Sequence, residues 1–129
     1  MEFPASSMGT ITGKALNKAN IENCHVKSAV VRNYSGGNTG GIVGAMDSGH
    51  IYNSDYEGQI ICMSGGYAGG ILGYPYSFIE FADCYTKGSL DNENGTYTGG
   101  VCACFGYGAS VVRCSVEMDL SGKEDVGGI

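Results

Sequence analysis

A glycine-rich motif that recurs about every 30 residues constrains the fold of this chain more than any other feature. The motif reads GGIVG at residues 40–44, GGILG at 69–73 and GGVCA at 99–103. A weaker copy, GTITG, begins at Gly9, and the chain stops within a further copy at Gly127. A fixed period of this length is typical of solenoids and related repeat folds, in which each unit buries its apolar face against its neighbours. The sequence therefore predicts stacked units rather than one irregular core.

A second block lies between the glycine motifs and repeats with a step of 30 residues. Its first column holds Cys24, Ser54, Cys84 and Cys114. The columns that begin at Val26, Ser28 and Val30 are also small or apolar, and the columns between them are mostly polar. Alternation of period two predicts a half-buried β-strand. We expect the even-numbered positions, including Ser28 and Val30, to face the core.

The glycine motif carries a second predicted strand. Its central column is formed by Ile11, Ile42, Ile71, Val101 and Ile129. β-Branched residues suit a packed, pleated surface, and flanking glycines allow tight corners, positive φ angles and close backbone approach. A third strand is expected around residues 78–81 and their equivalents. Residues 31–39, 61–68, 91–98 and 121–126 vary between copies and are predicted to be loops on one side of the solenoid.

One charged column indicates how the units stack. It alternates in sign from copy to copy: Lys27, Glu57, Lys87 and Glu117. Strands paired in register with the neighbouring copy would bring these opposite charges together. We therefore predict an all-β fold, a parallel β-helix or solenoid of about four coils with about 30 residues each. Right-handed winding is expected because parallel crossovers are nearly always right-handed.

The domain organisation follows from where the repeats begin. Residues 9–129 are expected to form a single solenoid domain, and residues 1–8 a ragged segment before it. Because the chain stops in the middle of a repeat, we expect it to be a fragment of a longer protein.

Composition and charge exclude several classes of protein. A formal net charge of −6 disfavours a nucleic-acid partner. With 43% hydrophobic and 16% charged residues the chain is too apolar to be disordered. It has no apolar run of the roughly 18 residues that a transmembrane helix needs. Residues 1–7 lack the basic and apolar regions of a signal peptide.

The Ile-x-Asn-Cys sequence at residues 21–24, the alternating strand after it and the GGIVG motif at 40–44 together resemble the GLUG repeat of bacterial surface proteins. The resemblance covers about residues 9–129 and rests on four interleaved copies. The chain departs from the pattern at Thr10, Thr12, Cys102 and Ala103, and at Arg113, where the other copies have Asn or Asp. Such repeats also occur beside the catalytic region of some immunoglobulin-A-cleaving metallopeptidases. The resemblance implies an extracellular β-solenoid segment of a larger exported protein, without catalytic residues of its own.

The cysteines have three interpretations, in decreasing order of preference. Packing explains the inward column of Cys24, Cys84 and Cys114, because free cysteine is among the most buried residue types. A disulfide between Cys84 and Cys114 comes second, since in-register side chains point the same way at a spacing slightly too wide for good geometry. Metal binding at Cys102 and Cys104 comes last, because zinc needs converging ligands and both histidines lie in other columns. We expect no metal and no cofactor.

The sequence predicts no catalytic residues and no enzyme activity. Its acidic residues are scattered, whereas sugar-cleaving sites bring carboxylates together. Asp91 and Glu93 are interpreted as part of a solvated loop rather than a calcium site. Two histidines and scattered serines do not form a triad pattern.

Aromatic residues provide the candidate binding surface. Tyr67 and Tyr97 precede equivalent Gly-Gly pairs and should stack on one another. Further aromatic residues follow the glycine strand in adjacent copies: Tyr74, Tyr76, Phe78, Phe105 and Tyr107. An exposed aromatic strip is typical of surfaces that contact sugars or partner proteins. We predict that the phenylalanines turn inward as corner packing. The candidate binding residues are therefore Tyr67, Tyr74, Tyr76, Tyr97 and Tyr107.

These observations predict a structural or adhesive segment of a bacterial surface or secreted protein, which displays or spaces binding regions. The alternative is a non-catalytic accessory domain of a secreted peptidase or glycan-degrading enzyme, which a flanking His-Glu-x-x-His motif would favour. The expected partner is a host glycan or a matrix protein, and no membrane insertion is expected for this segment. Unpaired strand edges at both ends also predict end-to-end self-association.

Overall fold

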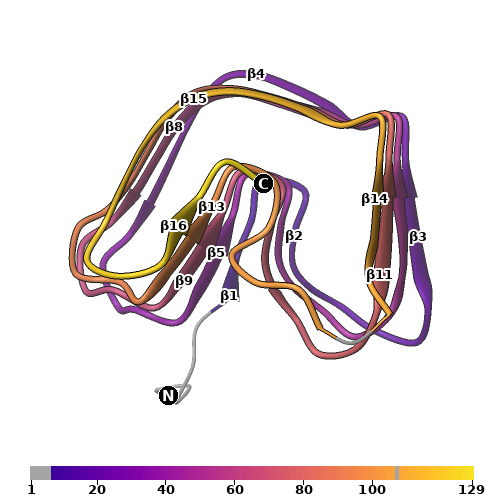
Figure 1. Ribbon diagram of the computed structural model, residues 1–129, viewed down its shortest axis with the longest axis horizontal. Helices are drawn as coiled ribbons and strands as arrows, with labels where there is room; N and C mark the ends of the chain where they lie inside the picture. Colours follow the sequence, from indigo (N-terminus) through magenta and orange to yellow (C-terminus); the bar gives the residue numbers. More distant parts are fainter. Residues whose placement is uncertain (1–6, 107) are drawn as a thin grey trace.

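The computed structural model describes residues 7–106 and 108–129. These residues form β-strands and no helix, and the strands associate into four parallel sheets (Figure 1). About four coils stack with a step near 30 residues, so the predicted all-β parallel solenoid is confirmed. The first paired residues, Ser7 and Met8, join the solenoid just before the predicted start at residue 9.

Each sheet pairs equivalent strands from neighbouring coils. Sheet A has the order β1 (Ser7–Met8), β5 (Asn38–Gly40), β9 (Tyr67–Gly69), β13 (Tyr97–Gly99) and β16 (Val126–Gly127). Sheet B has the order β10 (Leu72–Pro75), β6 (Val43–Met46) and β2 (Thr12–Ala15). Sheet C has the order β14 (Ser110–Val112), β11 (Ile79–Ala82), β7 (Gly49–Tyr52) and β3 (Ala19–Glu22). Sheet D has the order β15 (Ser115–Gly122), β12 (Tyr85–Asn92), β8 (Asp55–Cys62) and β4 (His25–Asn33).

The cross-section of the solenoid is notched. Viewed along the stack, sheet D crosses the top and sheet C forms one side, while sheets A and B run back toward each other below (Figure 1). The Gly-Gly pairs lie at the apex of this notch, where each coil passes from sheet A into sheet B. The glycine motif is therefore a corner between two short strands rather than a strand of its own.

The predicted register of sheet D is confirmed between the later coils. β12 pairs with β15 at a constant offset from Tyr85↔Ser115 to Asn92↔Gly122. β8 and β12 keep the same offset from their first residues onward. Equivalent side chains in these coils therefore stack directly above one another.

The first coil breaks this register. In β4, Lys27 and Ser28 lie opposite the single residue Glu57, so the rest of the strand is shifted by one residue. A β-bulge of this kind inserts one extra residue and reverses the facing of the residues after it. The predicted inward orientation of Ser28 and Val30 is wrong: Ser28 is exposed, Val30 is 52% exposed, and Val31 takes the buried position.

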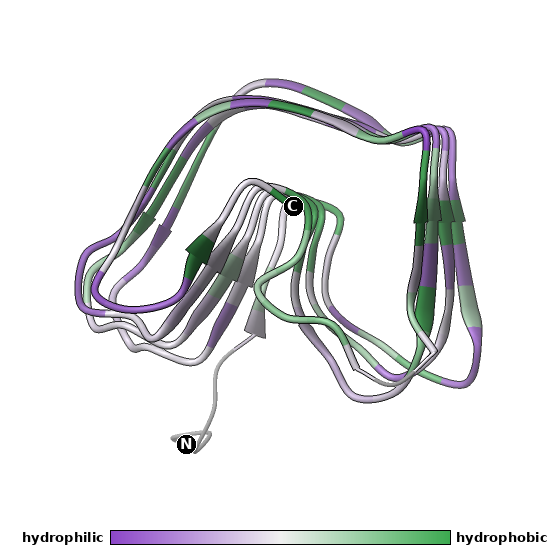
Figure 2. Cartoon of the chain, viewed as in Figure 1, coloured by the Kyte–Doolittle hydropathy of each residue, from purple (hydrophilic) through white to green (hydrophobic). Residues whose placement is uncertain are grey.

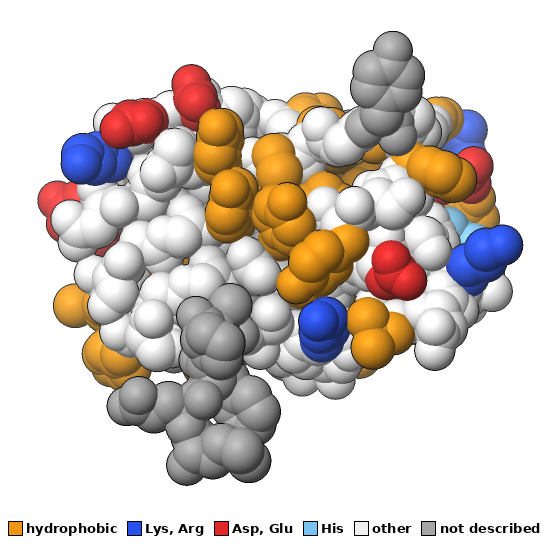
Figure 3. Space-filling model, turned by 90° about the horizontal axis from the view of Figure 1, so that it is seen from below, with side chains coloured by type: hydrophobic (Ala, Val, Ile, Leu, Met, Phe, Trp, Pro, Cys, Tyr) orange, Lys and Arg blue, Asp and Glu red, His pale blue; other side chains and the backbone are white. Residues whose placement is uncertain are grey.

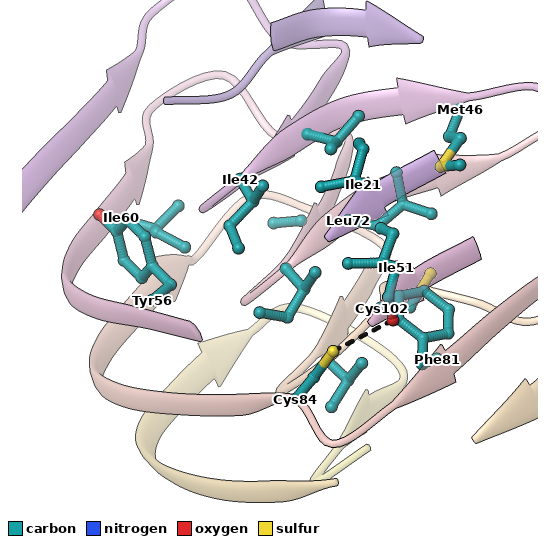
Figure 4. Packing of buried hydrophobic residues seen from close by; sticks show 14 of the residues in the cluster. Ile21, Ile42, Met46, Ile51, Tyr56, Ile60, Leu72, Phe81, Cys84 and Cys102 are labelled. Atoms are coloured by element: carbon teal, nitrogen blue, oxygen red, sulfur yellow. Dashed lines mark hydrogen bonds between the residues drawn. The ribbon is translucent and has the colours of Figure 1, made fainter. Parts of the chain in front are cut away.

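The core is built from columns of like side chains. Ile21, Ile51 and Phe81 are in register in sheet C and are buried. Hydrophilic residues alternate with them along each strand, as Figure 2 shows. Figure 4 shows these side chains meeting Ile42 and Leu72 inside the coil. Burial of each such side chain contributes about 1.5–3 kcal/mol.

The Gly-Gly corners exist because there is no space for a side chain. A Cβ on Gly70 would lie 2.0 Å from the carbonyl oxygen of Gly100 and 2.9 Å from Cγ2 of Thr86. A Cβ on Gly99 would lie 1.9 Å from the carbonyl oxygen of Cys102 in its own corner. Neither glycine has a positive φ angle. Close backbone approach, and not a left-handed conformation, therefore requires glycine here.

The corner between sheets C and D uses a different device. Its column consists of Asn23, Asn53, Asp83 and Arg113, with φ angles of 55°, 47°, 54° and 51°. These values lie in the left-handed region, which asparagine and aspartate tolerate best among residues with a side chain. The departure at Arg113 therefore leaves the turn geometry intact. Arg113 donates to both carboxylate oxygens of Asp83, at 2.6 and 2.9 Å.

The predicted long loops are short, because sheets A and D extend into them. β4 continues to Asn33 and β12 continues to Asn92. Both asparagines are buried, and their Nδ2 atoms donate to Thr39 at 2.9 Å and to Thr98 at 3.1 Å. These hydrogen bonds hold the corner closed, so only residues 34–37 and 93–96 remain between the strands.

The charged column has the predicted register but not the predicted ion pairs. Lys87 lies between Glu57 and Glu117 in sheet D. Glu117 instead accepts a hydrogen bond from the hydroxyl group of Tyr85, at 2.8 Å. The ion pairs among the described residues are His25–Asp55, His50–Glu22 and Arg113–Asp83.

Candidate functional site

The predicted aromatic residues come together on one face of the solenoid. Tyr67 and Tyr97 begin β9 and β13 in sheet A, whereas Tyr74 lies in β10 of sheet B and Tyr76 follows that strand. The Gly-Gly corner reverses the chain between β9 and β10, which brings the two sheets together at the notch. We call these four residues the tyrosine cluster. The fifth predicted residue, Tyr107, lies outside the described residues.

Ring contacts connect the whole cluster. Tyr67 and Tyr97 stack with centroids 5.2 Å apart and an interplanar angle of 6°, as predicted. Tyr67 contacts Tyr74 across the notch at 4.7 Å. Tyr74 meets the edge of Tyr76 at 5.2 Å. These distances are those of favourable aromatic pairs.

The cluster is partly exposed and has a cation at one end. Tyr76 is 52% exposed, and the other three side chains are half-buried. The Lys14 ammonium group lies 5.0 Å from the centroid of the Tyr76 ring, a cation–π arrangement. Figure 3 shows a continuous band of hydrophobic side chains over this face, with a basic side chain at one end. Burial raises the pKa of the Tyr67 phenol, so its hydroxyl group stays neutral and able to donate a hydrogen bond.

The two phenylalanines do not turn inward. Phe78 is 57% exposed and Phe105 is 41% exposed, so the predicted corner packing is wrong. Phe78 precedes β11, in which Ile79 and Phe81 take the inward positions, and alternation therefore turns Phe78 outward. The ring of Phe105 meets the edge of the buried Phe81 at 6.0 Å. Phe105 also lines an open cavity of about 290 Å³ at the C-terminal end of the stack.

Sequence reasoning missed a polar network on the outer face of sheet C. The Nε2 atom of His50 lies 2.6 Å from a carboxylate oxygen of Glu22, and its ring stacks on Tyr52 at 3.9 Å. The Tyr52 hydroxyl group donates to Glu80 at 2.5 Å, and this hydrogen bond raises the pKa of the Tyr52 phenol. The network ties three successive coils together. Reading the outward columns at the 30-residue step, 20/50/80 and 22/52/82, would have found it.

A shallow cavity of about 470 Å³ lies beside this network. Its lining includes Lys18, Asn20, His50, Phe78 and Glu80. Charges of both signs and one exposed ring meet there, so the cavity can accept hydrogen bonds and an apolar group. It is separate from the tyrosine cluster, which no residue of its lining belongs to.

The six cysteines are free thiols. Cys84 is buried in the predicted inward column, and its Sγ donates to the carbonyl oxygens of Ile51 and Ala82 at 3.3 and 3.4 Å (Figure 4). Burial raises the pKa of the Cys84 thiol to about 12, so the thiolate is suppressed. Cys102 is also buried, and burial raises its pKa as well. Packing is therefore the interpretation that the structure supports for this column.

Metal and membrane sites were also sought in residues 7–106 and 108–129. Within these ranges no group of three or more His, Cys, Asp or Glu side chains is arranged to hold a metal ion. The same residues contain no helix with the length and apolar character needed to cross a bilayer.

The fold thus defines a parallel β-solenoid that carries an aromatic surface cluster. Comparison of the chain with protein-family models, with curated proteins and with solved structures finds no match.

Proposed function

We propose that this chain is a structural and adhesive segment of a bacterial surface or secreted protein, and that it presents the tyrosine cluster to a partner. The observation that carries the proposal is the continuous contact from Tyr97 through Tyr67 and Tyr74 to Tyr76. It fixes four amphipathic rings on a rigid scaffold, where little side-chain entropy remains to be lost on binding. The resemblance of the glycine motif to GLUG repeats supports the exported location.

The arrangement of the rings favours a polypeptide partner over a glycan. A sugar stacks on a free ring face, but Tyr67 and Tyr97 cover one face of each other and Lys14 lies over Tyr76. The cluster therefore offers ring edges, hydroxyl groups and a basic end. Such a surface suits an extended segment of a matrix protein with apolar and acidic side chains.

Binding assays with matched tyrosine variants test this proposal. The chain would be offered to immobilised matrix proteins and, separately, to a glycan array. We expect Tyr76→Ala and Tyr97→Ala each to weaken binding to a matrix protein by about tenfold or more, because exposed aromatic anchors dominate interface energies. Tyr34→Ala is the matched control: Tyr34 is 66% exposed and lies outside the cluster.

The outcomes separate the parts of the proposal. Binding to glycans alone, with the same two variants affected, would reject the polypeptide partner. Binding that Tyr34→Ala weakens as much as Tyr76→Ala would reject the cluster as the site. An absence of binding to every matrix protein would reject the adhesive function.

A further inference from the structure

The two ends of the described solenoid present complementary surfaces. At one end, β15 pairs with β12 along all its residues, and its other edge has no partner in the described chain. Val116, Met118 and Leu120 of this strand are only partly buried. Their equivalents one coil earlier include Thr86 and Leu90, which are fully enclosed. The last coil thus offers an apolar cross-section and a row of backbone hydrogen-bonding groups.

The first coil offers the matching surface. β4 pairs with β8 on one edge only, and Ile11 and Leu16 are 52% and 53% exposed. Its bulge does not prevent pairing, because β8 already pairs with β4 on both sides of it. The same offset on the free edge would place Val26 beside Val116, and Val31 beside Leu120.

Charge distinguishes the two ends. Residues 7–39 contain four cationic side chains and one carboxylate: Lys14, Lys18, Lys27, Arg32 and Glu22. Residues 110–129 contain two cationic side chains and four carboxylates: Arg113, Lys123, Glu117, Asp119, Glu124 and Asp125. Contact between unlike ends therefore brings opposite charges together, whereas contact between like ends brings like charges together.

The alternating column makes the match specific. Lys27, Glu57, Lys87 and Glu117 occupy one column of sheet D, and the next residue in the alternation would again be a lysine. We propose that copies of this chain stack head to tail, with Lys27 of one copy beside Glu117 of the next. The strands then remain parallel across the junction, as they are within each copy. This inference goes beyond the proposed adhesive function and does not depend on the tyrosine cluster.

A charge-swap experiment tests both the association and its polarity. Analytical ultracentrifugation of the 129-residue chain at low salt should show oligomers whose size increases with concentration. Lys27→Glu and Glu117→Lys should each weaken association at least about fivefold, because each places like charges at the junction. A mixture of the two variants should associate again, because each end of one then faces an unlike end of the other.

A glycine at the open end provides a variant that spares the fold. Gly128 is equivalent to Gly100, at which a Cβ would meet the next coil 2.3 Å away, yet nothing lies within 4 Å of a Cβ on Gly128 itself. Gly128→Ala should therefore keep the circular dichroism and melting of the dilute wild-type chain and lose its association.

Crosslinking identifies which ends meet. Lys27 and Glu117 are three coils apart within one copy, about 14 Å at the usual strand spacing, so a zero-length carbodiimide link between them must join two copies. Mass spectrometry should find this link in the crosslinked oligomers. A strict monomer at all concentrations would overturn the proposal. So would a mixture of charge variants that stays monomeric, or links that join only the last coils of two copies.

Discussion

The two kinds of corner in each coil reach tight turns by different physical means. At the Gly-Gly corner, a side chain is excluded by the backbone of the next coil, as the 2.0 Å approach to Gly70 shows. At the corner between sheets C and D, the backbone adopts a left-handed conformation but the side chains point into open space. The first corner keeps Gly-Gly in three complete copies, while the second holds Asn, Asp or Arg. Lack of space therefore restricts the sequence more than an unfavourable φ angle does.

The largest effect is expected at the Gly-Gly corner. Gly70→Ala should lower the free energy of unfolding by at least about 3 kcal/mol, because the new methyl group meets a backbone carbonyl group that cannot move without displacing a coil. Urea denaturation followed by circular dichroism measures this change.

The same motif supplies the control for Gly70→Ala. Gly128→Ala, measured in dilute solution, should change the free energy of unfolding by less than about 1 kcal/mol, because nothing lies within 4 Å of the added Cβ. If the two alanine variants were equally unstable, crowding by the next coil would not be the reason for glycine at this corner.

A smaller effect is expected at the left-handed corner. Asn53→Ala should cost about 1–2 kcal/mol, since alanine disfavours the φ angle of 47° and the variant loses the 2.6 Å hydrogen bond to Asn23. Asn53→Gly loses the same hydrogen bond but accepts the conformation, so it should lie within about 0.5 kcal/mol of the wild type. Thermal melting of both variants compares them directly, and equal losses would mean that the hydrogen bond, rather than the φ angle, matters.

The smallest effect concerns Asp83 and Arg113 at the same corner. The hydrogen bonds and charge of Arg113 lower the pKa of the Asp83 carboxyl group below its ordinary value of 3.8. A carboxyl group with a lowered pKa in the folded state contributes stability above its unfolded pKa, and this contribution is lost as the pH falls through the folded value. The melting temperature should therefore fall slightly below about pH 4 through this pair.

Asp83→Asn is the control for this pH dependence. Asparagine keeps the preference for a left-handed conformation but removes the charge, so the variant should show a shallower acid decrease in melting temperature and less sensitivity to salt. Identical acid profiles for the wild type and the variant would show that the exposed pair contributes nothing measurable.

The columns of the repeat predict most of the fold. Parallel pairing, register and the inward facing of Ile51, Phe81 and Leu90 follow from period two combined with a step of 30 residues. The bulge at Ser28 could not be read in this way, because residue counting assigned the extra residue to the following loop. The short loops were missed for a related reason: buried Asn33 and Asn92 resemble loop residues until their hydrogen-bond partners are known.

The candidate site was predicted in part. Stacking of Tyr67 on Tyr97 follows from their equivalent positions, but the contact between Tyr67 and Tyr74 depends on how sharply the Gly-Gly corner folds sheet A onto sheet B. The orientation of Phe78 required the parity of β11, and its first residue was uncertain by one position. The network around His50 was missed because the two histidines were compared with cysteines, not with the carboxylates of the neighbouring coil.

The bulge at Ser28 shows how such a chain can change in length during evolution. Successive sheet A partners are Met8↔Thr39, Gly40↔Gly69, Gly69↔Gly99 and Gly99↔Gly127, so the coils differ in residue number although the sheet is continuous. Each insertion or deletion is confined to one bulge or turn, and the inter-coil hydrogen bonds restore the alignment after it. A duplicated coil can therefore gain or lose a residue without disturbing its neighbours, which makes lengthening by duplication tolerant of imprecise copying.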